Sequence, residues 1–209
     1  DIYGILDYGD FHSQWSRRKP EEDPNLEYRK GWDWYRYWMN NETTGTSSTF
    51  YLWLQYLRTM KRRYFDLVAD RSRHLMDVDT CHFSPDMPAR ADVEYSAADI
   101  VGCQYNHDFY HWSGWPKVHH TKADDILLYY YLTGDGRALD VAKEMQGMMK
   151  VMKQGAFGGG SIRVLSVPGR LAFNLYRHFW DAELLQYSRD SWETMRAFCG
   201  AGDRAYITY

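Results

Sequence analysis

Segment 123–152, ADDILLYYYLTGDGRALDVAKEMQGMMKVM, limits the possible folds of this chain more than any other feature. Its apolar residues recur every three or four positions on both sides of a T-G-D-G tetrapeptide, which predicts two helices joined by a tight turn. Segments 48–78 and 170–198 repeat this organisation, the first with a short basic break and the second with a turn at Asp181. The repetition predicts an all-α fold of antiparallel helical hairpins, each burying one face on its neighbours. An ordinary helical bundle would fit the pattern almost as well.

The size and charge of the chain narrow its class. Its 209 residues suffice for a sizeable core, so we expect residues 1–209 to form a single domain or part of one. The 25 basic and 28 acidic residues give a net charge of −3, which does not favour a nucleic-acid partner. No run of about eighteen apolar residues occurs, so no membrane partner is expected. The chain begins at Asp1 without a methionine or a signal-peptide pattern, which is typical of a processed chain or a piece of a larger one.

Cysteine and glycine spacing gives little sign of cofactor chemistry. Cys81, Cys103 and Cys199 contain no C-x-x-C pair, which argues against a structural zinc site, and they allow one disulfide. Segment 154–169, QGAFGGGSIRVLSVPG, contains a run of glycines, but no G-K-[ST] follows as in a phosphate-binding loop. We therefore expect this segment to be a flexible connection between helices.

Residues 104–121, QYNHDFYHWSGWPKVHHT, concentrate histidines and aromatic rings in one loop-like stretch. Four of the chain's eight histidines occur here, interleaved with tyrosines and tryptophans. Three interpretations compete: a metal site, a catalytic site for a sugar-like substrate, or a crowded core. His107 and His111 have the i, i+4 spacing that chelates zinc from a helix, but H-D-F-Y-H lacks the glutamate of the H-E-x-x-H motif. We favour one wall of a sugar-binding cleft, in which a histidine transfers a proton.

Two further polar clusters lie in the loop-like first part of the chain. D-Y-G-D-F includes Asp10 and precedes His12, and W-M-N-N-E-T contains Asn41 and Glu42. An array of helical hairpins would gather such loops on one face of the fold. We therefore expect these clusters to lie near the histidine-rich stretch.

A third cluster, R-H-L-M-D-V-D-T-C-H-F, lies at the end of a predicted helix. His74 and Asp77 are three positions apart, so they share a helix face and can hydrogen-bond. An aspartate beside a histidine fixes the tautomer and raises the basicity of the imidazole, as a general base requires. Asp79 and His82 follow just beyond the predicted helix end. The alternative is a salt-bridge network formed by Arg73, His74 and Asp77.

Five blocks of the chain resemble one family of enzymes: YGDFH, NNET, YLRTMKRRYFDLVADRSRHLMDVDTCHF, HDFYHW and HHTKADDILLYYYLTGDGRALDVA. Their order and spacing over most of residues 4–198 are similar to those of the exo-acting rhamnogalacturonan lyase-like family, within the α/α-toroid polysaccharide lyases that include ulvan and alginate-type lyases. The resemblance implies an incomplete or truncated (α/α)-toroid with long aromatic-rich loops, because three hairpins are too few for a full toroid. It also implies a secreted or periplasmic protein, whose usual flanking β-sandwich domains are not visible here.

The reaction that the resemblance implies is β-elimination in an acidic, uronate-containing polysaccharide. It requires a group that neutralises the uronate carboxylate, a base for the C5 proton and an acid for the leaving oxygen, and it requires no cofactor. The matching blocks imply His107 or His111 as the base, Tyr105 or Tyr110 as the acid, and His82 as a further catalytic candidate. Substrate-binding residues implied in the same way are Asn41, Glu42, Arg73, His74, Trp112, Trp115, His120 and Lys122.

Two other functions stay open. A glycoside hydrolase on the same scaffold would need two carboxylates about 5 to 10 Å apart, from among Asp10, Glu42, Asp77 and Asp79. A non-catalytic glycan-binding piece of a larger enzyme would fit the short length. The crowding of histidines favours the lyase, because a hydrolase needs paired acids. A zinc or calcium ion held by His107, His111 and a carboxylate is the alternative use of the histidines.

Overall fold

The computed structural model describes residues 12–13, 38–39, 48–83, 100–104, 106–107, 112–113, 118–152 and 162–198. These residues are mostly helical, which confirms the expectation of an α-helical fold. None of the described helices is both long and apolar enough to cross a membrane. The six α-helices of this part of the chain are α1 (Ser48–Thr59), α2 (Arg62–His74), α3 (Asp124–Thr133), α4 (Gly136–Val151), α5 (Ile162–Phe179) and α6 (Ala182–Phe198).

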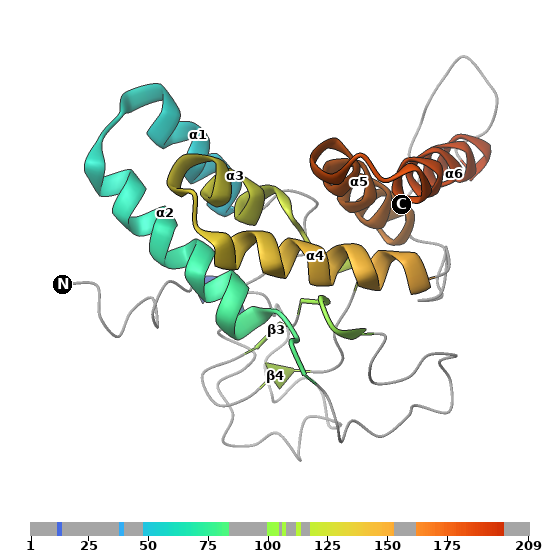
Figure 1. Cartoon of the computed structure of the whole chain (residues 1–209), viewed down its shortest axis with the longest axis horizontal. Helices are drawn as coiled ribbons and strands as arrows, with labels where there is room; N and C mark the ends of the chain where they lie inside the picture. The colour runs from blue at the N-terminus through green and yellow to red at the C-terminus, as the bar shows by residue number, and fades with distance from the viewer. Residues whose placement is uncertain are drawn as a thin grey trace, which may run out of the picture.

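The helices pack as three consecutive hairpins, α1 with α2, α3 with α4, and α5 with α6 (Figure 1). α4 contacts both helices of the third hairpin and also the π-helical segment η4 (Leu75–Asp79), which continues α2. All three hairpins contribute to one hydrophobic cluster, whose burial from water is the main stabilising term of the fold. Its fully buried members include Trp53, Ile126, Met145, Leu175 and Leu184.

The three hairpins turn in the same way. Each first helix ends at a residue with positive φ, namely Met60 (52°), Gly134 (72°) or Trp180 (56°). The backbone N–H of each donates to the carbonyl four residues earlier, at 2.6, 2.8 and 2.7 Å respectively. This geometry closes the last helical turn, and glycine adopts it without steric cost. The predicted repeat is therefore confirmed at the level of the turns.

Aspartates begin the second helix of two hairpins. The Asp135 side chain accepts a hydrogen bond from the Arg137 N–H at 3.0 Å, which caps α4. The Asp181 carboxylate likewise accepts from the Glu183 N–H at 3.0 Å, at the start of α6. Lys150 on α4 and Gln146 also reach Asp181, and these hydrogen bonds hold the pKa of its carboxyl below the usual value. The G-D and W-D pairs of the sequence therefore both stop one helix and start the next.

The predicted flexible connection over 154–169 is wrong in its second half. Helix α5 begins at Ile162 and includes Pro168, which has no N–H to donate within the helix. Both Pro168 and the next residue, Gly169, are buried. A Cβ at Gly169 would meet the Cβ of Ser191 on α6 at 2.7 Å, so glycine permits the two helices to approach closely. Two residues that normally break helices are retained here by packing between α5 and α6.

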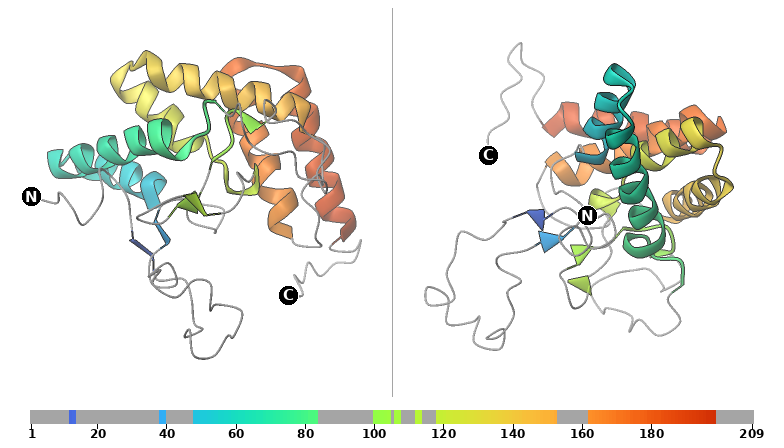
Figure 2. Two further views of the ribbon diagram at one scale, coloured as in Figure 1. Left: turned by 90° about the horizontal axis from the view of Figure 1, so that it is seen from below. Right: turned by 90° about the vertical axis from the view of Figure 1, so that its left-hand side faces the viewer.

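A small antiparallel sheet lies on one side of the hairpins, below α4 in Figure 1 and in the right-hand view of Figure 2. The sequence did not predict it, because strands of two residues are too short to show an alternating pattern. The bridge between Thr80 and Gln104 extends the pairing towards the end of η4. The strands, in spatial order, are β1 (His12–Ser13), β2 (Trp38–Met39), β3 (Asn106–His107) and β4 (Trp112–Ser113).

Candidate functional site

The sheet joins three of the clusters that the sequence singles out. Its register aligns His12 with Met39, Met39 with His107, and His107 with Trp112, so the four residues form one cross-strand row. His12 follows the first cluster, Met39 belongs to W-M-N-N-E-T, and the other two belong to the histidine-rich stretch. Backbone pairing therefore brings together segments that are far apart in the sequence.

The strand position of His107 changes the metal interpretation. The i, i+4 chelate requires a helix, whereas His107 lies in β3 and is paired with Trp112 across a hairpin. The helical geometry that the alternative metal interpretation would need is therefore absent at His107. Among the residues that the structure describes, no group of three or more His, Cys, Asp or Glu side chains could hold a metal ion.

The third cluster is tied to the same sheet through the bridge between Thr80 and Gln104. The Gln104 side-chain amide accepts from the Lys122 N–H at 3.0 Å and donates to the Lys122 carbonyl at 3.2 Å. The Gln104 N–H donates to Oγ1 of Thr121 at 2.9 Å. Gln104 is fully buried, so these bonds satisfy polar groups that have no access to water. They fix the segment before α3 against the entry to β3.

His120 and Lys122, both predicted to bind substrate, are buried in the structure. His120 lies in the short helix η6 (Val118–His120), and the ring of the half-buried His119 packs edge-on against it at 4.6 Å between centroids. The H-H-T-K segment therefore contributes to the interior of the described part of the chain. Because His120 and Lys122 are buried, they contribute to packing and are not directly exposed to a ligand.

The most informative polar group surrounds His82, and we call Asp77, His82, Arg137 and Glu144 the His82 cluster. Nδ1 of His82 lies 2.5 Å from Oε2 of Glu144, and Nη2 of Arg137 lies 3.0 Å from Nε2 of His82. The Arg137 Nε–H donates to Oδ1 of Asp77 at 3.0 Å. The His82 and Glu144 side chains are 25% and 28% exposed, so the pair is ordered by its contacts and still meets solvent.

The contacts of His82 define what its two ring nitrogens can do. Glu144 holds a proton on Nδ1, because a carboxylate only accepts hydrogen bonds. Nε2 lies 2.5 Å from the Met76 carbonyl, which accepts, and beside the guanidinium of Arg137, which donates. Nε2 can therefore carry a proton and donate a hydrogen bond to the Met76 carbonyl, or carry a lone pair that accepts from Arg137, but not both at once. A histidine oriented by a carboxylate and able to alternate between these states is suited to proton transfer.

The sequence did not point to Arg137 or Glu144 as members of a site. They lie seven positions apart on α4, so two helical turns bring them to the same face. That face meets η4, which carries Asp77. The seven-residue spacing could have indicated that Arg137 and Glu144 share a helix face. That this face meets η4 follows only from the packing of α4 against the first hairpin.

A second group, which we call the His74 cluster, contains Arg71, His74 and Asp79 and is buried. Nε2 of His74 lies 3.4 Å from Oδ1 of Asp79, and Nη1 of Arg71 lies 3.9 Å from Oδ2 of the same carboxylate. The structure therefore pairs His74 with Asp79 and not, as predicted, with Asp77. The reason is the π-helical geometry of η4, which brings residues five apart, rather than three or four apart, into alignment.

Arg73, a predicted substrate-binding residue, lies on the outside of the first hairpin. Its guanidinium donates to Asp70 at 2.9 Å and lies 5.8 Å from the ring centroid of Tyr129 on α3. The Asp70 contact lies within α2, whereas the Tyr129 contact joins α2 to α3. Arg73, His74 and Asp77 therefore belong to three separate groups, and the predicted single network of these residues does not form.

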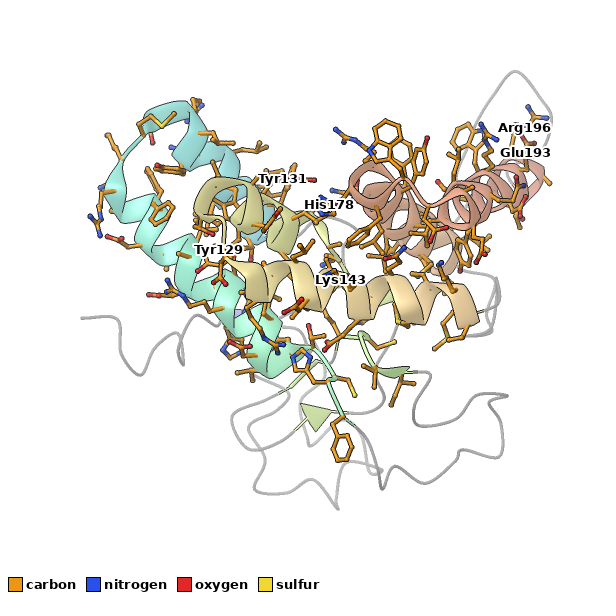
Figure 3. All side chains as sticks on the ribbon, in the orientation of Figure 1. Tyr129, Tyr131, Lys143, His178, Glu193 and Arg196 are labelled. Atoms are coloured by element: carbon orange, nitrogen blue, oxygen red, sulfur yellow. The ribbon has the colours of Figure 1, made fainter. Side chains whose placement is uncertain are left out.

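A further histidine lies on the other side of the hairpins, between α3 and α5. The hydroxyl of Tyr131 is 2.9 Å from Nδ1 of His178, and Figure 3 shows the two side chains facing one another. Burial lowers the pKa of His178, which keeps the imidazole neutral and able to accept from Tyr131. We regard this pair as a contact between hairpins, because the sequence clusters gather at the sheet and not here.

The remaining predicted residues have no described side chains. His107 and Trp112 are placed by strand register alone. Residues that lie outside the described ranges are Asp10, Asn41, Glu42, Tyr105, Tyr110, His111 and Trp115.

No family model, no curated protein and no solved structure matches this chain. The His82 cluster and the residues aligned by the sheet are therefore the features of this chain that bear on its function.

Proposed function

We propose that this chain is a polysaccharide lyase, or the helical part of one, that cleaves a uronate-containing glycan by β-elimination. The observation that carries the proposal is the His82 cluster, in which a carboxylate orients a partly exposed histidine and an arginine lies against its second ring nitrogen. The cross-strand row of His12, Met39, His107 and Trp112 adds histidines and an aromatic residue from other loops.

In the proposed mechanism Arg137 leaves His82 and pairs with the uronate carboxylate. A guanidinium suits this role because it binds a carboxylate through two parallel hydrogen bonds. The pairing stabilises the negative charge that develops when the C5 proton is removed. Departure of Arg137, together with rotation of the His82 ring away from the Met76 carbonyl, would expose the lone pair on Nε2 of His82, so substrate binding would release the base.

His82 then accepts the C5 proton on Nε2, while Glu144 stabilises the imidazolium through Nδ1. The electron pair of the C5–H bond forms the C4–C5 double bond, and the C4–O4 bond breaks. A tyrosine, Tyr105 or Tyr110, protonates the leaving oxygen. His107 or His111 is the alternative base, and Asn41 and Glu42 are further candidates for contacts to the uronate carboxylate.

We also propose that the three hairpins are part of an (α/α)-toroid. The shared turn geometry of the three hairpins supports a hairpin as the repeating unit of an (α/α)-toroid, and further hairpins would complete the ring. We propose that the loops gathered at the sheet form the substrate side of that ring, with Trp112 and Trp115 stacking on sugar rings. A secreted or periplasmic location, an acidic polysaccharide as partner and the absence of any required cofactor belong to the same proposal.

The hydrolase alternative is less well supported by the described residues. It needs two carboxylates that flank the glycosidic bond. Asp79 is fully buried beside Arg71 and His74, so it has no access to a sugar. Of the carboxylates considered for that reaction, Asp77 is exposed but binds Arg137. A lyase needs no such pair.

The test is ultraviolet absorbance during incubation with rhamnogalacturonan, ulvan, alginate and glucuronan. Elimination creates a double bond conjugated with the carboxylate, so we expect absorbance to rise with one of these substrates. New reducing ends without a rise would favour the hydrolase. If neither the absorbance nor the number of reducing ends increases, both enzyme proposals are contradicted and a glycan-binding role is left. If His107 rather than His82 is the base, His107→Ala should abolish the rise and His82→Ala should only reduce it.

A further inference from the structure

Cys81 and Cys103 lie opposite one another where the end of the first hairpin meets the segment before β3. The antiparallel bridge pairs Thr80 with Gln104, and beyond this bridge Cys81 faces the two-residue bulge formed by Gly102, whose φ is 95°, and Cys103. Their backbones are hydrogen-bonded, since the Cys81 N–H donates to the Cys103 carbonyl at 2.8 Å. The Cys81 carbonyl accepts from the Gly102 N–H, also at 2.8 Å.

We propose that Cys81 and Cys103 form a disulfide, with Cys199 as the remaining thiol. The 2.8 Å hydrogen bond from the Cys81 N–H to the Cys103 carbonyl keeps their Cα atoms within about 6.7 Å of one another, which is compatible with the range of about 4.4 to 6.8 Å found for disulfides. This hydrogen bond therefore meets the backbone requirement for a disulfide. The proposal is independent of the lyase function, because it depends only on the pairing of these two segments.

The two side chains are thiols in the structure and lie in the core. Sγ of Cys103 lies 2.8 Å from Sδ of Met148, and Sγ of Cys81 lies 3.9 Å from the Phe83 carbonyl. Bond formation requires the two sulfurs to turn towards one another. Burial raises the pKa of the Cys103 thiol, and the neighbouring Cys81 thiol raises it further. The buried thiol is therefore a poor nucleophile in the folded state.

These properties indicate when the bond forms. A low-molecular-weight disulfide, such as oxidised glutathione, supplies the oxidising equivalents. One cysteine thiolate attacks it and releases one small thiolate, and the second cysteine then attacks the mixed disulfide and releases the other. The oxidant gains two electrons, and both cysteine protons pass to solvent or to the released thiolates. The exchange takes place during folding or local opening, after which burial protects the bond from reductants.

The bond would also affect the candidate site. Cys81 immediately precedes His82, and Cys103 lies three positions before β3. The cross-link would hold His82 at a fixed distance from the sheet. It would close a loop of roughly twenty residues and raise the melting temperature by about 5 to 12 °C relative to the reduced protein.

The experiment uses the chain carrying Cys199→Ser, refolded in a buffer of reduced and oxidised glutathione and then treated with a thiol-alkylating reagent under denaturing conditions. We expect a protein that takes up no reagent, and a peptide map in which the peptides of Cys81 and Cys103 are joined. Melting of the same sample with and without a strong reductant gives the stabilisation by the disulfide.

Alkylation of both cysteines after refolding would overturn the proposal, as would a joined peptide in the parent chain that contains Cys199 and one of the other two. Cys103→Ser in the same background is the control, and its melting temperature should not respond to reductant. The results do not depend on catalysis, so failure of the disulfide and failure of the lyase proposal are distinguishable.

Discussion

The His74 cluster and the His82 cluster contain the same kinds of side chain and differ in burial. Arg71, His74 and Asp79 are 2%, 3% and 0% exposed at their side chains. In the His82 cluster, by contrast, His82 is 25% exposed and Arg137 is 41% exposed. Both clusters draw on a single stretch of sequence at the end of the first hairpin. Residue type alone therefore does not separate a structural group from a candidate site.

Burial determines how much each cluster contributes to stability and whether it can bind a ligand. A buried charge must be paired, and loss of one partner leaves the other uncompensated in a medium of low dielectric constant. An exposed pair contributes little to stability, because water and salt screen it. The exposed cluster can therefore exchange one of its contacts for a ligand at small cost, whereas the buried one cannot.

The largest expected effect follows from Asp79→Asn. This change removes the carboxylate charge that faces Arg71 and His74 with almost no change in shape. We expect the free energy of unfolding to fall by about 3 kcal/mol, because a buried guanidinium loses its counter-charge. Denaturant unfolding at neutral pH measures it. A loss below about 1 kcal/mol would mean that the buried cluster is not a structural requirement.

The second prediction contrasts the two histidines. Under the proposed mechanism His82→Ala should lower turnover at least about a hundredfold while the melting curve changes little. His74→Ala is the matched control, and it should destabilise the fold because His74 is buried beside Asp79. Initial rates of absorbance increase and thermal melts of both variants are the measurements. If turnover falls equally in the two variants, and only in proportion to unfolded protein, His82 has no catalytic role.

The third prediction concerns Arg137. Arg137→Met should lower kcat/KM by about tenfold on a uronate substrate, since a charged hydrogen bond to the carboxylate is lost. Arg137→Lys should recover part of this loss, because it retains the charge but not the two-pronged geometry. A variant that behaves like the parent protein on uronate substrates would exclude Arg137 from carboxylate binding.

The smallest effect is expected from Asp77→Asn. Asp77 is 54% exposed and pairs with Arg137 at 3.0 Å, so its charge is well screened. We expect the free energy of unfolding to change by less than about 0.5 kcal/mol. The same denaturant experiment as for Asp79→Asn measures it. Similar losses in these two variants would remove the distinction between the clusters.

Part of the fold could be read from periodicity and part could not. The three hairpins follow from apolar spacing, and two of their turns also follow from G-D or W-D; both signals act over a few residues. The first half of α5 escaped prediction because Pro168 and Gly169 are normally helix breakers. Their retention depends on close packing against Ser191, a contact with another helix. Local signals cannot contain that information.

The candidate site, like the fold, could be predicted from the sequence only in part. Its chemistry-bearing residue types and their concentration in a few loops were evident in the sequence, and His82 was among the candidates. The pairing of His74 with Asp79 depends on the π-helical turn of η4, which no apolar pattern indicates. Glu144 and Arg137 become partners of His82 only because α4 packs against η4.

The sequence by itself determined the helical class, the three hairpins and the inventory of histidines, carboxylates and aromatic rings, because these depend on residue type and short-range spacing. The tertiary structure alone decided which polar groups are buried and which are exposed. It also decided the cross-strand row from His12 to Trp112 and the juxtaposition of Cys81 with Cys103. The reason is physical: burial and pairing depend on contacts between residues distant in the chain, and these contacts form only when the hairpins pack.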